Sequence, residues 1–196
     1  MNPIQKIKDH CVFNSSYVYF IEANARNKIN TRKPNSNESK LLKFMIKTPE
    51  DIEIQFNKIS VLCNNSSLNY YIYLSINPRD IRKGYTEMKK IFLQYDHDIL
   101  YNLDVLDHRL KHLDNKWYSV LETPACKATR RYLLDIDVKD IPTELYEINF
   151  KNIVKYESNN GHHWIVDPFD VRLIEDIEFV HVKTDAKFYI DKIINY

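Results

Sequence analysis

The scarcity of glycine restricts this sequence most: only Gly84 and Gly161 occur among its 196 residues. The phosphate-binding loops of P-loop and dinucleotide-binding folds need several glycines in a short stretch, because only glycine lets the backbone approach a phosphate so closely. The sequence therefore excludes both of these glycine-rich motifs. A phosphate-bearing ligand of this chain must be held by side chains and by isolated backbone amides.

The composition indicates a folded domain. Hydrophobic residues make up 44% of the chain and aromatic residues 13%, which is enough to build a core. The cysteines Cys11, Cys63 and Cys126 are far apart and form no CxxC pair, so a zinc ribbon and a disulfide scaffold are not expected. We find no apolar run of membrane-spanning length and no signal peptide. We expect a cytoplasmic protein, in the host cytoplasm if the source is a phage or virus, as the bias toward Asn, Ile, Lys and Tyr suggests.

Charge is distributed unevenly along the chain. Residues 1–113 hold 17 Lys and Arg against 12 Asp and Glu, a net charge of +5, whereas residues 114–196 hold 11 against 15, a net charge of −4. We therefore expect residues 1–196 to form a single domain with a soft boundary near 114, between an N-terminal lobe (1–113) and a second lobe (114–196).

Local patterns predict a mixture of helices and strands. Thr48 suits a helix N-cap and Pro49 the first turn that follows it. Polar residues 24–40 are typical of a loop. Residues 86–113 have a helical pattern, as one long helix or two short ones. Strands are expected at 17–23, 41–47, 70–76, 117–121, 132–138, 150–157, 162–166, 179–183 and 187–190.

The clearest chemical pattern is Asp135-Ile136-Asp137, inside an apolar strand. Residues i and i+2 of a strand project from the same face, so the two carboxylates are expected side by side. Like charges repel at that distance unless a cation neutralises them, and Mg²⁺ or Mn²⁺ prefers oxygen ligands. The alternative is a partly exposed strand whose acids are solvated.

A second pattern, Ser158-Asn159-Asn160-Gly161-His162-His163, connects two predicted strands. Ser158 and His163 can both donate to an anion, and Gly161 permits a positive φ or close approach of a phosphate. A plain hairpin with surface histidines is the alternative.

Two further segments are weaker alone. Val182-Lys183-Thr184-Asp185 places an acid near the end of a late strand, and Ile76-Asn77-Pro78-Arg79 ends another strand in a basic turn.

In this order, the four segments resemble the archaeo-eukaryotic primase superfamily, and in particular the catalytic core of phage and plasmid primase-polymerases. That superfamily has a DxD strand, an SxxGxH or SxH hairpin and a later strand leading to an Asp. Here these correspond to Asp135 and Asp137, to Ser158 through His163, and to Asp185. Asn77-Pro78-Arg79 also resembles an upstream strand end in these enzymes, so that the resemblance spans about residues 70–190.

The resemblance implies an α+β fold: an N-terminal αβ lobe packed on a C-terminal RRM-like antiparallel sheet, with the active-site cleft between them. It implies a DNA primase or primase-polymerase, a nucleotidyltransferase that uses two divalent ions, Mg²⁺ or Mn²⁺. Its partners would be a single-stranded DNA template, ribo- or deoxyribonucleoside triphosphates, and a separate helicase or priming subunit. Asp135, Asp137 and Asp185 would be catalytic metal ligands, and Ser158, His163, Lys127, Arg130 and Arg79 would bind the nucleotide.

Several alternatives stay open. Asp167 and Asp170 compete with Asp185 for the third carboxylate, and the interval from DxD to His163 is short for the family. The chain could be a catalytically inactive protein of this fold that binds nucleic acid or another protein. A HAD-type phosphatase, which also has a hydrophobic DxD strand, ranks lower because only 59 residues follow Asp137.

Three further features of the sequence are weaker indications of function. Residues 26–47 hold seven Lys and Arg against one acid and could contact a template. The tyrosines of 70–73 belong mainly to the core, with base stacking as the less favoured role. Asp104, His108 and His112 share a helical face, for which solvent exposure is favoured over zinc binding.

Overall fold

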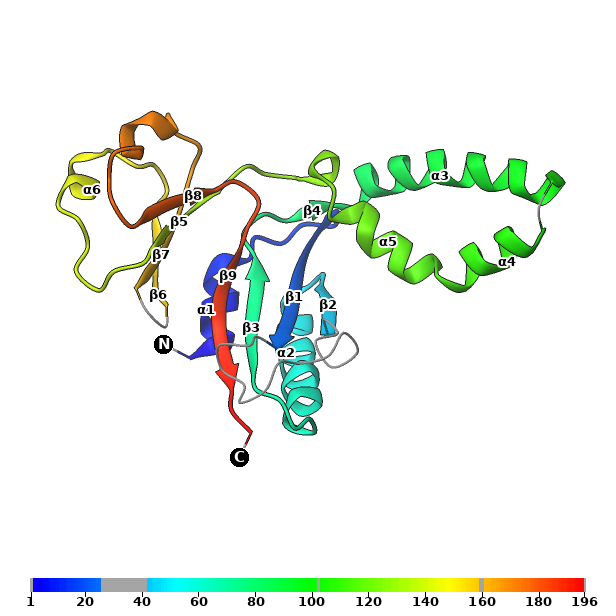
Figure 1. Cartoon of the computed structure of the whole chain (residues 1–196), viewed down its shortest axis with the longest axis horizontal. Helices are drawn as coiled ribbons and strands as arrows, with labels where there is room; N and C mark the ends of the chain where they lie inside the picture. The colour runs from blue at the N-terminus through cyan, green and yellow to red at the C-terminus, as the bar shows by residue number, and fades with distance from the viewer. Residues whose placement is uncertain (1, 26–41, 102, 159–160, 196) are drawn as a thin grey trace.

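The computed structural model describes residues 2–25, 42–101, 103–158 and 161–195. They form an α+β fold with two antiparallel sheets and six α-helices, which confirms the α+β part of the predicted fold class (Figure 1). Most of the predicted 24–40 loop lies outside the described residues. No described helix combines the length and the apolar character needed to cross a membrane.

The first sheet has the strand order β2-β1-β3-β9, and one of its two faces is covered by two helices (Figure 1). The main core lies between this sheet and the helices, and includes Ile21, Ile59 and Leu74. The short strand β4 pairs with β1. The elements are α1 (Pro3–His10), β1 (Tyr17–Ala25), β2 (Leu42–Ile46), α2 (Pro49–Asn64), β3 (Tyr70–Ser75), β4 (Arg79–Asp80) and β9 (Lys187–Ile193).

Helix α2 begins where the sequence predicts. The Thr48 hydroxyl accepts from the Asp51 backbone N–H, and the Asp51 carboxylate accepts in return from the Thr48 N–H at 3.0 Å. This capping box satisfies donors that the first helical turn leaves unpaired. Ile52 and Ile59 then point into the core at helical spacing.

The second sheet has the order β6-β7-β5-β8. The strands that carry the three predicted motifs are therefore neighbours in one sheet, as expected. Leu134, Ile136 and Trp164 point to a second core on the side away from the first sheet. The elements are β5 (Tyr132–Ile136), α6 (Glu144–Glu147), β6 (Val154–Glu157), β7 (His162–Val166) and β8 (Val180–Lys183), with 3-10 helices at Pro124–Cys126 and Val171–Ile174.

Between β4 and β5 the chain forms a helical arm that projects from the sheets (Figure 1): α3 (Ile81–Tyr101), α4 (Leu103–Lys111) and α5 (Leu113–Leu121). The predicted strand at 117–121 is wrong. Trp117 and Leu121 are four residues apart on one helical face and pack around Gly84, where an added Cβ would lie 2.4 Å from the Leu121 side chain. The predicted boundary near 114 lies at the start of α5, and β9, from the second half, pairs with β3.

Candidate functional site

Asp135 lies at the centre of the second sheet, opposite His163 of β7 and His181 of β8. Its Oδ1 atom accepts from His163 Nε2 at 3.0 Å, and its Oδ2 atom is bonded by the ammonium of Lys183. The carboxylate is largely buried, with 17% of its side chain exposed. The negative charge of Asp135, for which the sequence alone suggested a bound cation, therefore has two partners within the protein.

The hydrogen bond from His163, with a smaller effect from Lys183, holds the pKa of Asp135 well below its usual value, although burial acts in the opposite direction. Asp135 is consequently ionised throughout the neutral range. An ionised carboxylate is the form that coordinates a metal or a cationic group.

His163 connects the second sheet to the first. Its Nδ1 atom accepts from the backbone N–H of Tyr189 in β9 at 3.3 Å, so the ring proton lies on Nε2 and is directed at Asp135. The sequence assigned His163 to phosphate binding. In the structure both ring nitrogens are bonded within the protein, and the residue is 8% exposed.

Asp137 lies just beyond the end of β5 and is much more exposed, at 57% of its side chain. Its Oδ2 atom is 3.9 Å from Nε2 of His181, the residue that faces Asp135 across the β5–β8 pair. Both acids and His181 therefore lie toward one face of the sheet. His181 was not predicted from the sequence, although its place two residues before Lys183 on a strand puts both side chains on one face.

Gly161 fixes the hairpin beside this acid pair. Ser158 donates its backbone N–H to the Gly161 carbonyl at 2.9 Å, which closes the β6–β7 turn. A Cβ on Gly161 would lie 1.9 Å from the Ile136 carbonyl oxygen, and the φ of Gly161 is not positive. The glycine is therefore needed for close approach to β5. Asn159 and Asn160 lie outside the described residues.

Asp185 lies four residues beyond His181 and meets the basic residues predicted from the sequence. Its carboxylate accepts from Arg79 at 2.7 Å and is 3.2 Å from the Lys127 ammonium. Arg79 is 4% exposed, so Asp185 neutralises a nearly buried guanidinium. The structure thus brings Asp185 to the basic rim of the site and not to Asp135 and Asp137.

The other predicted residues have different positions. Arg130 is exposed on the segment before β5. Asp167 accepts from the Asn152 amide at 2.6 Å, and Asp170 caps a 3-10 helix and pairs with Arg172 at 2.6 Å. Neither competing acid makes a contact with the Asp135 cluster among these interactions.

Asn77 joins the two sheets at this site and is completely buried. Its side-chain oxygen accepts from the Arg131 N–H at 2.7 Å, and its amide donates to the Arg131 carbonyl at 3.1 Å and to the Thr184 carbonyl at 3.5 Å. One side chain thereby connects the end of β3 with the segments that lead to Asp135 and Asp185. Within the Asn-Pro-Arg segment, Asn77 thus joins the two sheets by hydrogen bonds, and Arg79 forms an ion pair with Asp185.

A cavity of about 480 Å³ opens between the sheets beside Lys183 and Asp185. Tyr73 and Glu22 of the first sheet line its other side. Glu22 is 4% exposed and is bonded by the Lys187 ammonium. Two lysines, Lys183 and Lys187, and two acids, Glu22 and Asp185, therefore line this cavity, and Lys183 connects it to Asp135.

A charge network missed by the sequence analysis borders the same cavity. Glu122, at the end of α5, lies 2.6 Å from Lys43 and 3.2 Å from Lys187. Burial raises the pKa of Glu122, but the two lysines outweigh this effect and the net shift is downward. The network joins Glu22 of β1, Lys43 of β2, Glu122 at the end of α5 and Lys187 of β9. No local sequence pattern relates such distant segments.

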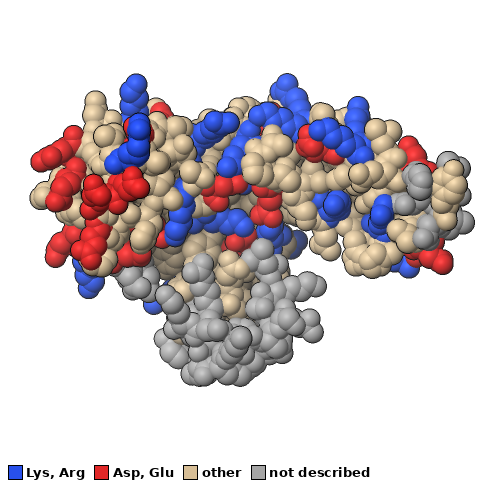
Figure 2. All heavy atoms as spheres, turned by 45° about the horizontal axis from the view of Figure 1, so that its top comes forward, with Lys and Arg blue, Asp and Glu red and all other residues tan. Residues whose placement is uncertain are grey.

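On the face drawn in Figure 2, acidic side chains gather at the end that carries the second sheet, and Lys and Arg are frequent over the centre and the arm. The charge asymmetry of the sequence is thus partly reproduced in space. The two kinds of charge interleave where the sheets meet.

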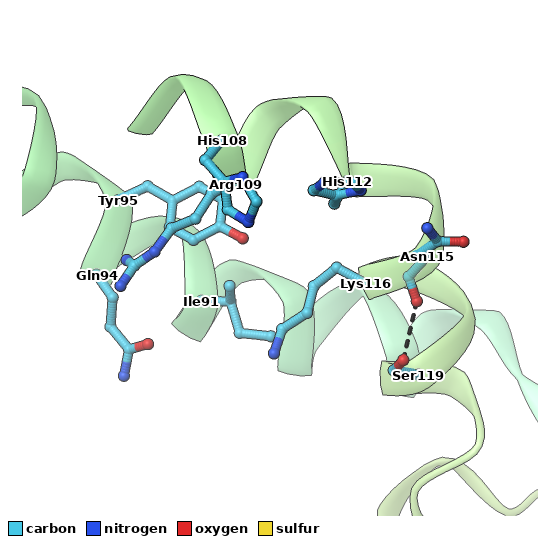
Figure 3. A pocket seen from close by; sticks show the side chains of 9 residues that line it. All are labelled: Ile91, Gln94, Tyr95, His108, Arg109, His112, Asn115, Lys116 and Ser119. Carbon is cyan, nitrogen blue, oxygen red and sulfur yellow. Dashed lines mark hydrogen bonds between the residues drawn. The ribbon is translucent and has the colours of Figure 1, made fainter. Parts of the chain in front are cut away.

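A separate cavity of about 400 Å³ lies on the arm, between residues 91 and 119 (Figure 3). His108 and His112 line it with their rings 4.8 Å apart, and Lys116 reaches into it from α5. Asp104 is exposed. Among the described residues no group of three His, Cys, Asp or Glu side chains could hold a metal ion, here or at Asp135.

No family model, curated protein or solved structure matches this chain. The strand pairing bears on one alternative: β5 is antiparallel to both β7 and β8. The DxD strand of a HAD-type phosphatase belongs to a Rossmann-like parallel sheet, so the HAD-type alternative does not fit.

Proposed function

We propose that this chain is a template-directed nucleotidyltransferase of the primase-polymerase type. The observation that carries the proposal is the convergence of the predicted motifs: Asp135 is paired with His163 of the hairpin strand, and β8, which leads to Asp185, lies on its other side. Sequence order alone does not require these strands to be neighbours. The RRM-like character of the second sheet is part of the proposal.

Asp135 and Asp137 would hold the divalent ions, because their carboxylates are hard oxygen donors on one face. Bound Mg²⁺ or Mn²⁺ would supply electrostatic stabilisation of the charge that develops during phosphoryl transfer. His163, with a smaller contribution from Lys183, holds Asp135 ionised in the metal-free chain. Asp137, more exposed, offers the more accessible ligand. Asp185 as a third ligand stays a prediction that would require release from Arg79 and Lys127.

The chain's own cations would bind and orient the triphosphate. Two of them, Lys127 and Arg79, are paired with Asp185, which lines the inter-sheet cavity. Two others, Lys183 and Lys187, line the cavity themselves. These side chains replace the glycine-rich loop that the composition excludes. His163 would then act by fixing Asp135, rather than by touching phosphate, because both its nitrogens are bonded.

The experiment is incubation with a single-stranded template, labelled nucleotides and Mn²⁺, with and without a primer. We expect metal-dependent incorporation by the wild type and its loss in Asp137→Asn. Asp140→Asn is the matched control, because Asp140 is an exposed acid three residues further along the same segment. Full activity in Asp137→Asn would remove the assignment.

One observation favours a second candidate, a catalytically inactive protein of this fold that binds nucleic acid: both oxygens of Asp135 are bonded within the protein. This candidate predicts oligonucleotide binding without nucleotide incorporation at any Mn²⁺ concentration. The incubation therefore separates the two candidates.

A further inference from the structure

Three tyrosines form a cluster on the face of the first sheet that lies opposite the main core. Tyr70 and Ile72 of β3 point into the core, so Tyr71 and Tyr73 point to the opposite face. Tyr189 of β9 lies on that face as well, because its neighbours Phe188 and Ile190 belong to the core. The sequence analysis had assigned the tyrosines of this region mainly to the core.

The rings are held in fixed positions by one another. Tyr71 and Tyr73 have centroids 6.3 Å apart, and Tyr189 lies 5.9 Å from the first and 6.5 Å from the second, all in edge-to-face geometry. All three residues are part-exposed. A set of preorganised rings on a sheet surface offers stacking surfaces at low conformational cost.

Three lysines lie near the cluster, one of which, Lys187, is paired with Glu22 and Glu122. Lys192 faces Tyr71 across the β3–β9 pair, and the ammonium of Lys6 lies 5.5 Å from the Tyr189 ring centroid. Lys187 lies on β9 two residues before Tyr189. Aromatic rings interleaved with cations match a single strand of nucleic acid, whose bases stack on rings while its phosphates meet ammonium groups.

The cluster is continuous with the candidate site. Tyr73 lines the inter-sheet cavity together with Lys183, and Lys183 is bonded to Asp135. A strand lying on the tyrosines would therefore lead toward the acid pair.

We propose that Tyr71 and Tyr73, supported by Tyr189, are a stacking platform for the bases of a single-stranded nucleic acid. The choice of this occupant rests on the proposed function, which requires a template, and on the charge complementarity of the surrounding lysines. The platform accepts bases through their faces, so it binds without strong sequence preference.

The test measures binding of a fluorescently labelled single-stranded oligonucleotide to the full chain by anisotropy. Tyr71→Leu and Tyr73→Leu keep an apolar side chain on the strand but remove the ring, and each should weaken binding about 5- to 100-fold. Tyr71→Phe and Tyr73→Phe should bind within about twofold of the wild type, because the ring remains. Tyr85→Leu, which removes a tyrosine that is 57% exposed on the arm, is the control and should bind normally.

The proposal is overturned if the Leu variants bind as tightly as the wild type, if the Phe variants lose as much affinity as the Leu variants, or if the wild type binds no oligonucleotide. Thermal unfolding of each variant establishes that it is folded. Asp137→Asn should bind the oligonucleotide normally. Ring-dependent binding without nucleotide incorporation would support the stacking platform and contradict the proposed enzyme. Nucleotide incorporation together with normal binding by the Leu variants would support the enzyme and contradict the platform.

Discussion

Replacing Asp135 by Asn should destabilise the protein at neutral pH. The substitution removes the ion pair with Lys183 and weakens the hydrogen bond from His163. The Lys183 side chain is half exposed, so solvent limits that pair to at most about 1 kcal/mol. The His163 bond is shielded and charge-assisted, and Asn keeps an acceptor there, so its weakening adds about 1 kcal/mol. We expect a total loss of about 1–2 kcal/mol.

This loss should depend on pH in a defined direction. Because the folded protein holds the pKa of Asp135 below its ordinary value, the carboxylate stabilises the fold above about pH 4, and the contribution is lost as the pH falls below that value. The difference between wild type and Asp135→Asn should therefore be largest near pH 7 and should narrow near pH 3.

Urea denaturation followed by circular dichroism at both pH values measures this difference. Asp137→Asn is the comparison: with its side chain 57% exposed, it should change stability by less than about 0.5 kcal/mol. An Asp135→Asn protein as stable as the wild type, or more stable, would show that the two acids mainly repel each other. The DxD pattern taken alone would predict that result, and the contacts to His163 and Lys183 predict the opposite.

Three further variants test the surroundings of the site. Asn77→Ala should cost about 2–4 kcal/mol in urea denaturation, because it removes the hydrogen bonds that join the sheets and leaves buried backbone groups unpaired; a loss below about 1 kcal/mol would contradict that role. Gly161→Ala should cost about 3 kcal/mol or more in thermal unfolding, since its Cβ would overlap the Ile136 carbonyl, and a wild-type melting temperature would refute the close approach. Asp185→Asn should cost about 1–3 kcal/mol in urea denaturation by leaving Arg79 without its charged partner, whereas unchanged stability would show that the guanidinium does not depend on it.

Local chemistry made much of the fold predictable. Thr48 and Pro49 marked the start of α2, and the alternating and apolar patterns identified most strands of both sheets. The strand expected at 117–121 failed because its apolar residues serve a helix equally well, and the packing around Gly84 decides between the two.

The neighbouring positions of the motif strands were predictable from the sequence, but the contacts of their side chains were not. The motif strands are neighbours, whereas Arg79 and Lys127 pair with Asp185 rather than with Asp135 and Asp137, and Arg130 is exposed. The partners of Asp135 depend on strand register, which places His181 and Lys183 of β8 beside β5, and sequence spacing does not encode that register. The Glu122 network joins segments far apart in the chain, so only the folded structure reveals it.

The most direct test of the central claim is thermal unfolding with a nucleoside triphosphate in the presence and absence of Mn²⁺. A ligand that binds only the folded state raises the melting temperature. We expect a rise that requires both the triphosphate and Mn²⁺, that is absent in Asp137→Asn and that persists in the control Asp140→Asn. No rise in the wild type, or an equal rise in Asp137→Asn, would contradict a metal-dependent nucleotide site at the acid pair.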